Sequence, residues 1–296
     1  MSSFKAQPPS LARRPQRRVG LLDLLRAPRR VPLVMGIVNV TLDSFYPDSR
    51  TPAPGQAADA VLRQVEQGAD LVDIGGQSTR PGSEPVSVEE ELRRVVPVFE
   101  VLAGRVRVPL SIDTDKARVA RECLALGASV VNDVSALRQD PAMMEIAAGA
   151  EAVILMHRGG DSPKTMQDGP RYADVVKEVK DFLIERKLAF ARAGGKPERV
   201  IFDPGIGFGK KLEHNLSLLR HLDELAVLGP LALGASRKSF LGRIIADQGP
   251  ADRLDGSLAA ACWAALHGAS ILRVHDVLAT RRALATLEAI LGAGAS

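Results

Sequence analysis

Three polar side chains stand at the ends of short apolar runs and could together bind a flat ligand. Asp113 and Asp203 directly follow such runs, and Asn132 ends another. Carboxylate and amide groups that face one cavity suit a ring with several N–H donors beside an acceptor, because a wrong ligand would leave buried polar groups unpaired. A single Asp at such a place, Asp113 for example, more often caps the next helix. Three such residues on neighbouring strands favour a ligand site.

A second group of side chains is cationic. Arg273 and His275 lie at the end of the last apolar run, and Arg237 and Lys238 follow the run before it. Arginine presents a fork of donors that suits phosphate, and a helix N-terminus adds a positive pole. The segment Lys238–Leu241 predicts a short helix at this place. We therefore expect an anion here, with His275 as one of its ligands.

Three polar loops could complete the site. Residues 41–50 and 79–82 are rich in Pro, Gly, Asp and Ser, and we expect mobile lids there because such loops bury little apolar surface. Residues 203–209, Asp-Pro-Gly-Ile-Gly-Phe-Gly, place three glycines around Phe208. The glycines let the backbone approach a flat ligand, and the ring could stack on it. The loop lacks the Gly-Lys-Ser/Thr ending of a Walker A phosphate loop.

The sequence shows neither a Ser-His-Asp order with a nucleophile elbow nor a cluster of His and Cys residues. A triad mechanism and a zinc centre are therefore not indicated. A substrate that carries pyrophosphate would bring its own need for Mg²⁺, which prefers oxygen ligands and substrate phosphates. Asn39, at the end of the first apolar run, is the protein oxygen that we expect at the metal.

These side chains need a scaffold that brings many strand ends together. Short apolar runs alternate with segments whose apolar residues recur at helical spacing, and uninterrupted apolar runs are typical of parallel strands buried on both faces. The expected strands are Leu33–Val38, Leu71–Ile74, Leu110–Ile112, Val130–Asn132, Ala152–Met156, Val200–Phe202, Leu231–Leu233 and Ile271–Val274. Expected helices include Ala57–Gln67, Val88–Leu102, Lys116–Leu126, Tyr172–Ala193 and Asp255–His267.

Eight strand–helix units predict the α/β class and a single (β/α)8 TIM barrel, which needs roughly 250 residues; the chain has 296. The alternative is an open doubly wound sheet, which would carry a glycine-rich dinucleotide fingerprint after its first strand. No Ser/Gly linker divides the chain, and we interpret Gly159–Pro170 as a long loop within the barrel. Catalytic residues of such barrels lie at the carboxyl ends of the strands, where the polar side chains above are found.

The N-terminal segment differs in composition from the rest. Residues 1–30 hold eight Lys or Arg and one Asp, and the remaining residues therefore carry a net negative charge. We interpret residues 1–30 as a basic, disordered extension whose removal leaves activity intact, and residues 31–296 as the barrel domain. An organellar transit peptide is the lesser alternative. Because the body is not basic, a nucleic-acid partner is disfavoured.

Membrane insertion is not expected, since no apolar stretch approaches eighteen residues. Cys123 and Cys262 lie far apart, and neither belongs to a C-x-x-C motif. Two free thiols suit a reducing compartment, and we expect a cytoplasmic protein.

Seven short motifs in order resemble the dihydropteroate synthase family over about residues 33–292. Each tetrapeptide alone is weak, but seven of them at successive strand ends are specific. The motifs are Met35-Gly36-Ile37-Val38-Asn39-Val40-Thr41 with Asp43-Ser44-Phe45, Asp73-Ile74-Gly75-Gly76 with Ser78-Thr79-Arg80-Pro81-Gly82, Ser111-Ile112-Asp113-Thr114, Asn132-Asp133-Val134-Ser135, Asp203-Pro204-Gly205, Ser236-Arg237-Lys238-Ser239 and Arg273-Val274-His275-Asp276-Val277.

The resemblance implies an enzyme that joins 6-hydroxymethyl-7,8-dihydropterin pyrophosphate to 4-aminobenzoate in folate biosynthesis, with Mg²⁺, in a homodimer that sulfonamides inhibit. The C–O bond to pyrophosphate would break first, and the arylamine would then capture the pterin cation. The implied catalytic residues are Lys238, Asp203 and Arg273. Pterin binding is implied for Asp113, Asn132, Met156, Asp203, Phe208 and Lys238. Pyrophosphate binding is implied for Asn39, Arg273 and His275, with Mg²⁺ at Asn39. The 4-aminobenzoate would meet Phe45, Thr79, Arg80, Pro81, Lys238 and Ser239.

The chain departs from the family pattern at four places. Leu42 stands where Pro is usual, and residues 46–50 replace the usual Ser-Asp-Gly-Gly, which indicates a stiffer and bulkier first lid. Gln77 replaces a common Glu, and His157-Arg158-Gly159-Gly160 replaces a His-Met-Gln-Gly type. The departures in the first lid concern the arylamine side rather than the pterin pocket.

Two other functions remain open at this point. A methyltetrahydrofolate–corrinoid methyltransferase would share the Asp and Asn contacts but should lack the loops at residues 78–82 and 236–239. A pterin-binding paralogue could have lost catalysis through its first lid. For an active synthase, we expect Lys238→Ala and Arg273→Ala each to cut activity severely without unfolding the protein.

Overall fold

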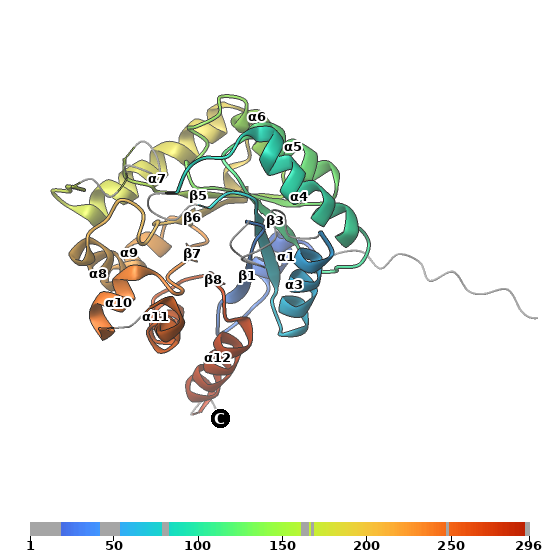
Figure 1. The fold of residues 1–296 in the computed structure, drawn as a ribbon. Helices are drawn as coiled ribbons and strands as arrows, with labels where there is room; N and C mark the ends of the chain where they lie inside the picture. The colour runs from blue at the N-terminus through green and yellow to red at the C-terminus, as the bar shows by residue number, and fades with distance from the viewer. Residues whose placement is uncertain are drawn as a thin grey trace, which may run out of the picture.

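The computed structural model describes residues 19–41, 54–78, 83–160, 166, 169–246 and 249–293. Its described strands are parallel and curl into a barrel that helices surround (Figure 1). Every expected strand is confirmed to within one residue at each end. The strands are β1 (Leu33–Asn39), β2 (Leu71–Gly75), β3 (Leu110–Asp113), β4 (Val130–Asp133), β5 (Ala152–Met156), β6 (Val200–Asp203), β7 (Ala232–Leu233) and β8 (Ile271–Val274).

Pairing of the first and last strands closes most of the barrel. Strands β1 to β6 pair in chain order, β7 pairs with β8, and β8 pairs with β1. The seam between β6 and β7 holds a bridge between Phe202 and Leu231 and a 2.9 Å hydrogen bond from Phe202 N to Pro230 O. The (β/α)8 TIM barrel is therefore confirmed, and the open doubly wound sheet is wrong. Because the strands are parallel, their carboxyl ends meet at one mouth of the barrel.

Helices connect successive strands on the outside of the barrel (Figure 1). Helix α4 has the predicted bounds, whereas α7 begins later than predicted because Asp174 caps it and accepts hydrogen bonds from two backbone amides. No described helix is both long and apolar enough to cross a membrane. The helices are α3 (Pro54–Glu66), α4 (Val88–Leu102), α5 (Ala117–Ala125), α6 (Met143–Ala148), α7 (Val175–Arg192), α8 (Leu212–Arg220), α9 (Leu222–Ala226), α10 (Ser239–Ile245), α11 (Leu254–Leu266) and α12 (Val277–Gly292), with short 3-10 turns at η1 (Pro197–Arg199) and η2 (Pro250–Arg253).

Side-chain alternation along the strands divides the core into two regions. Outward-facing residues such as Val72 and Ile112 pack under the helices in the larger cluster. The floor of the barrel interior is a second, apolar cluster formed by Leu33, Met35, Leu71, Val130, Ala152, Ile154, Ile201, Ala232 and Ile271. One step nearer the carboxyl ends, most inward-facing positions are polar. The apolar floor therefore supports a polar mouth.

The structure corrects the expected disorder of residues 1–30 in one part. Residues Leu21–Arg26 form helix α1, and Leu21 is fully buried in the same cluster as the barrel floor. The backbone amide of Leu22 donates to Glu151 Oε1 at 3.1 Å. Helix α1 thus closes the amino-terminal end of the barrel, because the floor would otherwise expose apolar side chains to water. Residues 1–18 lie outside the described residues.

Candidate active site

A chain of charged contacts links four strand ends at the mouth of the barrel. Asp73 Oδ2 accepts hydrogen bonds from Asn132 Nδ2 at 2.9 Å and from Arg273 Nε at 2.7 Å. Arg273 Nη2 donates to Asp113 Oδ2 at 2.6 Å. The ends of β2, β3, β4 and β8 are therefore held together by side chains rather than by the backbone ladder alone.

Strand register explains why these groups converge. On β3, Leu110 and Ile112 pack outward under the helices, so Ser111 and Asp113 face the interior. Asp113 lies beside Asn132 in the register of β3 with β4. A Cβ atom on Gly75, at the end of β2, would lie only 3.3 Å from Asp113 Cβ, so the glycine leaves room for the carboxylate.

The carboxylates around Arg273 keep its guanidinium group charged. The pKa of Arg273 is lowered by burial, but the carboxylates of Asp73 and Asp113 outweigh that effect, and the net shift is upward. Burial raises the pKa of Asp113; Arg273 opposes the rise, and Asp73 adds to it. Since Asp73 and Asp113 already engage Nε and Nη2 of Arg273, a phosphate bound here would meet Nη1.

Asp203 and Lys238 form the opposite side of the mouth. Asp203 Oδ1 accepts a hydrogen bond from Gly205 N at 2.7 Å, which fixes the carboxylate at the start of the glycine-rich loop. Lys238 Nζ donates to the carbonyl of Ile206 and lies 4.3 Å from the centre of the Phe208 ring. The loop and the lysine therefore form one unit.

The wall beside this unit is apolar. Met156 and Phe208 belong to one buried cluster with Val134 and Met166. Met156 lies beside Asp203 in the register of β5 with β6. The structure thus brings a flat apolar wall next to the acceptors at the mouth, which suits a ring that is apolar on its faces and polar at its edge.

Burial shifts the pKa values of both charged groups in this unit. It lowers the pKa of Lys238 to about 7, although Asp203 opposes the shift. It raises the pKa of Asp203, which Lys238 and the hydrogen bond from Gly205 oppose. The cationic form of Lys238 is therefore in equilibrium with the neutral amine near neutral pH.

Only some of the cationic residues that were expected to bind an anion are available to a ligand. His275 is exposed at the end of β8, and its backbone amide donates to Ser236 Oγ at 3.2 Å. Arg237 instead pairs with Asp276 through bonds of 2.8 and 2.6 Å. The short extra helix is confirmed as α10, with Lys238 as its N-cap residue. Ser239 is exposed at its first position.

Asn39 lies half-buried at the end of β1, beside Gly75 in register. Among the described residues, no group of three or more His, Cys, Asp or Glu side chains could hold a metal ion by itself. One amide oxygen at the mouth fits Mg²⁺, which typically keeps few protein ligands and binds substrate phosphates and water. The donor set therefore suits a metal that arrives with the substrate.

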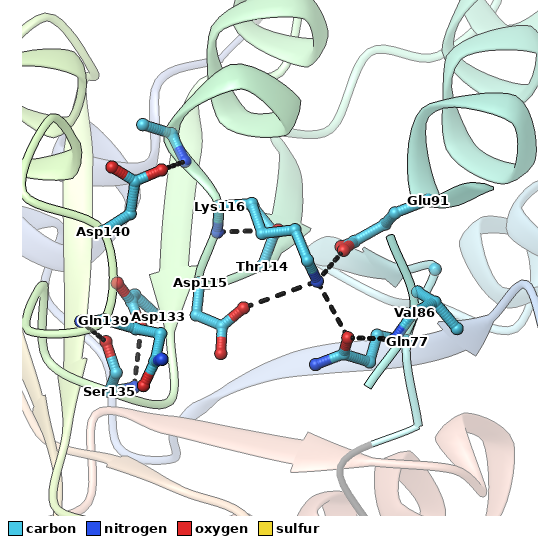
Figure 2. Close-up of polar contacts among 12 residues, drawn as sticks. Gln77, Val86, Glu91, Thr114, Asp115, Lys116, Asp133, Ser135, Gln139 and Asp140 are labelled. Atoms are coloured by element: carbon cyan, nitrogen blue, oxygen red, sulfur yellow. Dashed lines mark hydrogen bonds and ion pairs between the residues drawn. The ribbon is translucent and has the colours of Figure 1, made fainter. Parts of the chain in front are cut away.

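The loop after β2 is anchored at both of its described ends (Figure 2). Gln77 Oε1 accepts from Lys116 Nζ at 2.8 Å and from Val86 N at 3.0 Å, and Lys116 Nζ also donates to the buried Glu91 at 2.6 Å. A cavity of about 510 Å³ lies between this loop and the loop after β4. Hydrogen bonds thus hold the base of the loop.

Four of the predicted arylamine ligands belong to the loops after β1 and β2. Phe45, Thr79, Arg80 and Pro81 lie outside the described residues.

Two other polar strand-end residues have structural roles. Asp133 faces away from the mouth and accepts bonds from the amides of Ser135 at 2.6 Å and Leu137 at 3.1 Å. His157 is buried against the edge of Phe182, with ring centres 4.9 Å apart. Neither side chain is therefore a candidate ligand for the substrate.

Asp73 is the site residue that was missing from the predicted ligands. It is fully buried and connects Asn132 to Arg273. Its signal was available, since Asp73 interrupts an apolar strand at an inward-facing position. The prediction took polar residues at or near the strand ends and therefore passed over a polar residue in the middle of β2.

Comparison with known proteins agrees with this geometry. Residues 35–275 match the family model described as pterin binding enzyme. The dihydropteroate synthase of Escherichia coli K12 is 46% identical over 263 residues, which cover 88% of this chain and 93% of that protein.

Solved structures show the same similarity. Xanthomonas albilineans dihydropteroate synthase with 4-aminobenzoic acid superposes with a TM-score of 0.82 at 48% identity, covering 88% of this chain and 93% of that one. The same enzyme with 7,8-dihydropteroate gives 0.79 at 45% identity, covering 88% and 94%. The Yersinia pestis enzyme in a sulfonamide drug complex gives 0.84 at 44% identity, covering 89% and 95%. This chain therefore belongs to the pterin-binding enzyme family, among the dihydropteroate synthases.

Proposed function

We propose that this protein condenses 6-hydroxymethyl-7,8-dihydropterin pyrophosphate with 4-aminobenzoate to give 7,8-dihydropteroate and pyrophosphate. The observation that carries the proposal is the convergence of Asp113, Asn132 and Asp203 at the barrel mouth, beside Lys238 and Phe208. These acceptors match the N–H groups of an aminopyrimidinone edge. The family's solved complexes with 4-aminobenzoic acid and 7,8-dihydropteroate support the arylamine substrate and the product.

The pterin ring would lie between the polar edge and the apolar wall. Asp113 and Asp203 accept hydrogen bonds from ring N–H groups, and Asn132 offers both a donor and an acceptor. Met156 and Phe208 contact the ring face. Because Asp73 already orients Asn132 and Arg273, the edge is organised before the substrate binds.

Bond cleavage would precede bond formation. The C–O bond between the pterin methylene and pyrophosphate breaks, and its electron pair leaves with pyrophosphate. The nitrogen lone pair of 4-aminobenzoate then forms the C–N bond, and the amine loses its proton to solvent. Lys238 and Arg273 stabilise the departing negative charge, and His275 lies on the same side. This course needs no protein nucleophile.

Mg²⁺ is part of the proposal. Asn39 would supply one oxygen ligand at the end of β1, and the pyrophosphate oxygens and water would supply the others. When bound, the ion neutralises charge on the leaving group.

The arylamine would bind on the side of α10, where Lys238 and the exposed Ser239 lie. Phe45, Thr79, Arg80 and Pro81 are its other proposed contacts. Sulfonamides are expected to compete with 4-aminobenzoate, and the sulfonamide drug complex of the Yersinia pestis enzyme supports sulfonamide binding. A corrinoid methyltransferase is less consistent with the chain, because the loops at residues 78–82 and 236–239 match the synthase pattern.

Pyrophosphate release tests the proposed function. The purified protein should release one pyrophosphate per dihydropteroate only when both substrates and Mg²⁺ are present, and sulfonamide should raise the apparent KM for 4-aminobenzoate. Omission of the arylamine is the control. A folded protein that binds the pterin but releases no pyrophosphate with both substrates would be the catalytically inactive paralogue instead.

A homodimer is also proposed, with α11 and α12 at the interface. These two helices lie side by side (Figure 1), and α11 is apolar nearly all round. Its Leu266 is 54% exposed, and Ile290 on α12 is 65% exposed. A surface helix with apolar residues on its outer face is typical of an interface with another chain. A cytoplasmic location fits the two free thiols, Cys123 and Cys262.

Light scattering on a sizing column tests the dimer. Leu266→Glu should shift the protein toward the monomer, whereas Leu188→Glu on α7, also at an exposed leucine, should leave the mass unchanged. A monomeric wild type would refute the proposed interface.

A further inference from the structure

One buried cation has no part in the proposed chemistry. Lys210 follows the glycine-rich loop and is only 3% exposed. Its Nζ lies 3.0 Å from Gly205 O, 3.0 Å from Phe208 O and 3.3 Å from His157 O. The same atom lies 2.8 Å from His157 Nδ1. No carboxylate is among these partners, which is unusual because an isolated buried charge is costly.

The protonation state of Lys210 sets the hydrogen-bonding role of His157. When Lys210 is protonated, its ammonium group has donors and no acceptor, so His157 Nδ1 accepts and the ring proton lies on Nε2. Burial lowers the pKa of Lys210 well below its usual value, and Asp203 opposes that shift. Burial lowers the pKa of His157 to about 2, and the charge of Lys210 adds to that effect. His157 is therefore a neutral acceptor, and Lys210 shares its three N–H donors among His157 Nδ1 and the carbonyls of Gly205, Phe208 and His157. Gly205 O and Phe208 O also accept hydrogen bonds from the backbone amides of Phe208 and Gly159.

The glycine-rich loop needs this support because of its backbone conformation. Gly205, Gly207 and Gly209 have positive φ values of 65°, 83° and 63°. Such a turn has no regular backbone ladder to satisfy its polar groups. Lys210 donates to two of the loop carbonyls, those of Gly205 and Phe208. Asn215 Oδ1 accepts a hydrogen bond from Gly207 N at 2.7 Å. The loop is thus held by side chains from the segment that follows it.

The same ammonium group connects two neighbouring strand ends. His157 directly follows Met156 at the end of β5, whereas Phe208 belongs to the loop after β6. A Cβ atom on Gly205 would lie 1.8 Å from His157 O, so the two segments pack at backbone contact. Met156 and Phe208, which lie in one apolar cluster, are therefore held in place by backbone groups that share Lys210.

We propose that Lys210 is a positioning residue that sets the place of Met156 and Phe208 and so shapes the slot for the pterin ring. This inference rests on the proposed function, because it assigns the slot to the pterin. Lys210 itself would not contact the substrate. It acts through the carbonyls of His157 and Phe208.

A pair of adjacent lysines offers a matched test. Lys210→Met removes every donor, whereas Lys211→Met changes a neighbouring lysine that is exposed. For Lys210→Met we expect the KM for pterin pyrophosphate to rise about tenfold, the effect of roughly one lost net hydrogen-bond contribution. The KM for 4-aminobenzoate in Lys210→Met should differ from that of the wild type by less than about twofold. Lys210→Gln, which keeps two donor hydrogens, should recover part of the loss, and Lys211→Met should behave as the wild type.

Hydrogen exchange adds a readout that does not depend on turnover. The amides of residues 205–209 should exchange faster in Lys210→Met than in Lys211→Met, while those of β3 stay unchanged. If Lys210→Met does not fold, Asn215→Ala removes the other support of the loop and should give the same difference between the two KM values.

Several results would overturn the inference. An unchanged pterin KM in a folded Lys210→Met protein would do so, as would an equal rise in both KM values or unaltered exchange of the loop amides. A failure of the proposed function looks different, because the wild type itself would then release no pyrophosphate, and the exchange measurement would still judge the role of Lys210 in the loop.

Discussion

Single residues at the mouth serve both binding and folding. From the sequence, Arg273 was expected to be a pyrophosphate ligand whose loss would leave the fold intact. The structure instead places it between two carboxylates, with Asp73 fully buried and Asp113 nearly so. Removal of the arginine would leave both without their cation, and a buried charge without its partner is strongly destabilising.

Arg273→Ala should therefore lower the free energy of unfolding by about 3–5 kcal/mol, besides reducing activity. Urea denaturation measures this loss. Arg273→Lys keeps the charge but not the fork of donors, so it should lose less stability while activity still falls sharply. A change of less than about 1 kcal/mol in Arg273→Ala would contradict the role of the ion pairs.

The pH dependence of the activity is also set by a single residue, Lys238. Burial lowers the pKa of Lys238 to about 7, so the cation is present below that pH and is lost as pH rises through it. Because kcat/KM reports the free enzyme, its value for pterin pyrophosphate should fall above about pH 7. Lys238→Arg stays charged and should lose this alkaline limb. A profile that is the same in both proteins would exclude Lys238 as the titrating group.

At the scale of elements, the loops that follow the strands determine how the site side chains are held in place. The β6 loop shows this most directly, because a Cβ atom on Gly207 would lie 3.0 Å from Lys238 Cδ at a φ of +83°. The loop after β2 is held differently, through Gln77 and Lys116. A substitution within a loop can therefore affect the backbone, a neighbouring side chain, or both.

A pair of glycine variants separates these two effects. Gly104 also has a positive φ, of 72°, but open space where its Cβ would lie. Gly104→Ala and Gly207→Ala should both lose about 1–2 kcal/mol of unfolding free energy from the left-handed backbone. Gly207→Ala should in addition displace Lys238 and lower kcat/KM. Thermal unfolding and kinetics measure the two effects, and equal activity in both variants would exclude the contact.

The barrel as a whole depends on a segment that the composition assigned to a disordered extension. Helix α1 packs against the barrel floor, where Leu21 is fully buried. The boundary between the extension and the barrel at residues 30 and 31 remains a prediction. Stability of the barrel is nevertheless linked to residues before that boundary.

Truncations test this link. Removal of residues 1–18 should leave the melting temperature unchanged, whereas removal of residues 1–26 should lower it by exposing the barrel floor. Leu21→Ala alone should cost about 2–5 kcal/mol, as buried leucines do. Val19→Ala, at a residue that is 51% exposed, is the matched control. If the longer truncation melts like the shorter one, helix α1 does not contribute to the stability of the barrel.

The sequence by itself determined the strands, the barrel and the positions of most mouth residues. Apolar runs buried on both faces identify the strands, and parallel strands bring their carboxyl ends together, so residues such as Asp113 and Asp203 had to lie near one another. The N-terminal helix was missed because six residues are too short for a periodic pattern, and basic flanks dominate the composition of that segment.

Only the tertiary structure decided the partners of these side chains. Asp73 and Arg273 are 200 positions apart and belong to β2 and β8, so no local pattern could indicate their bond. The same is true of Lys210, which looks like a surface lysine in the sequence but is buried against carbonyls from two loops. Register and loop packing set these contacts, because they depend on how distant segments fit around one mouth.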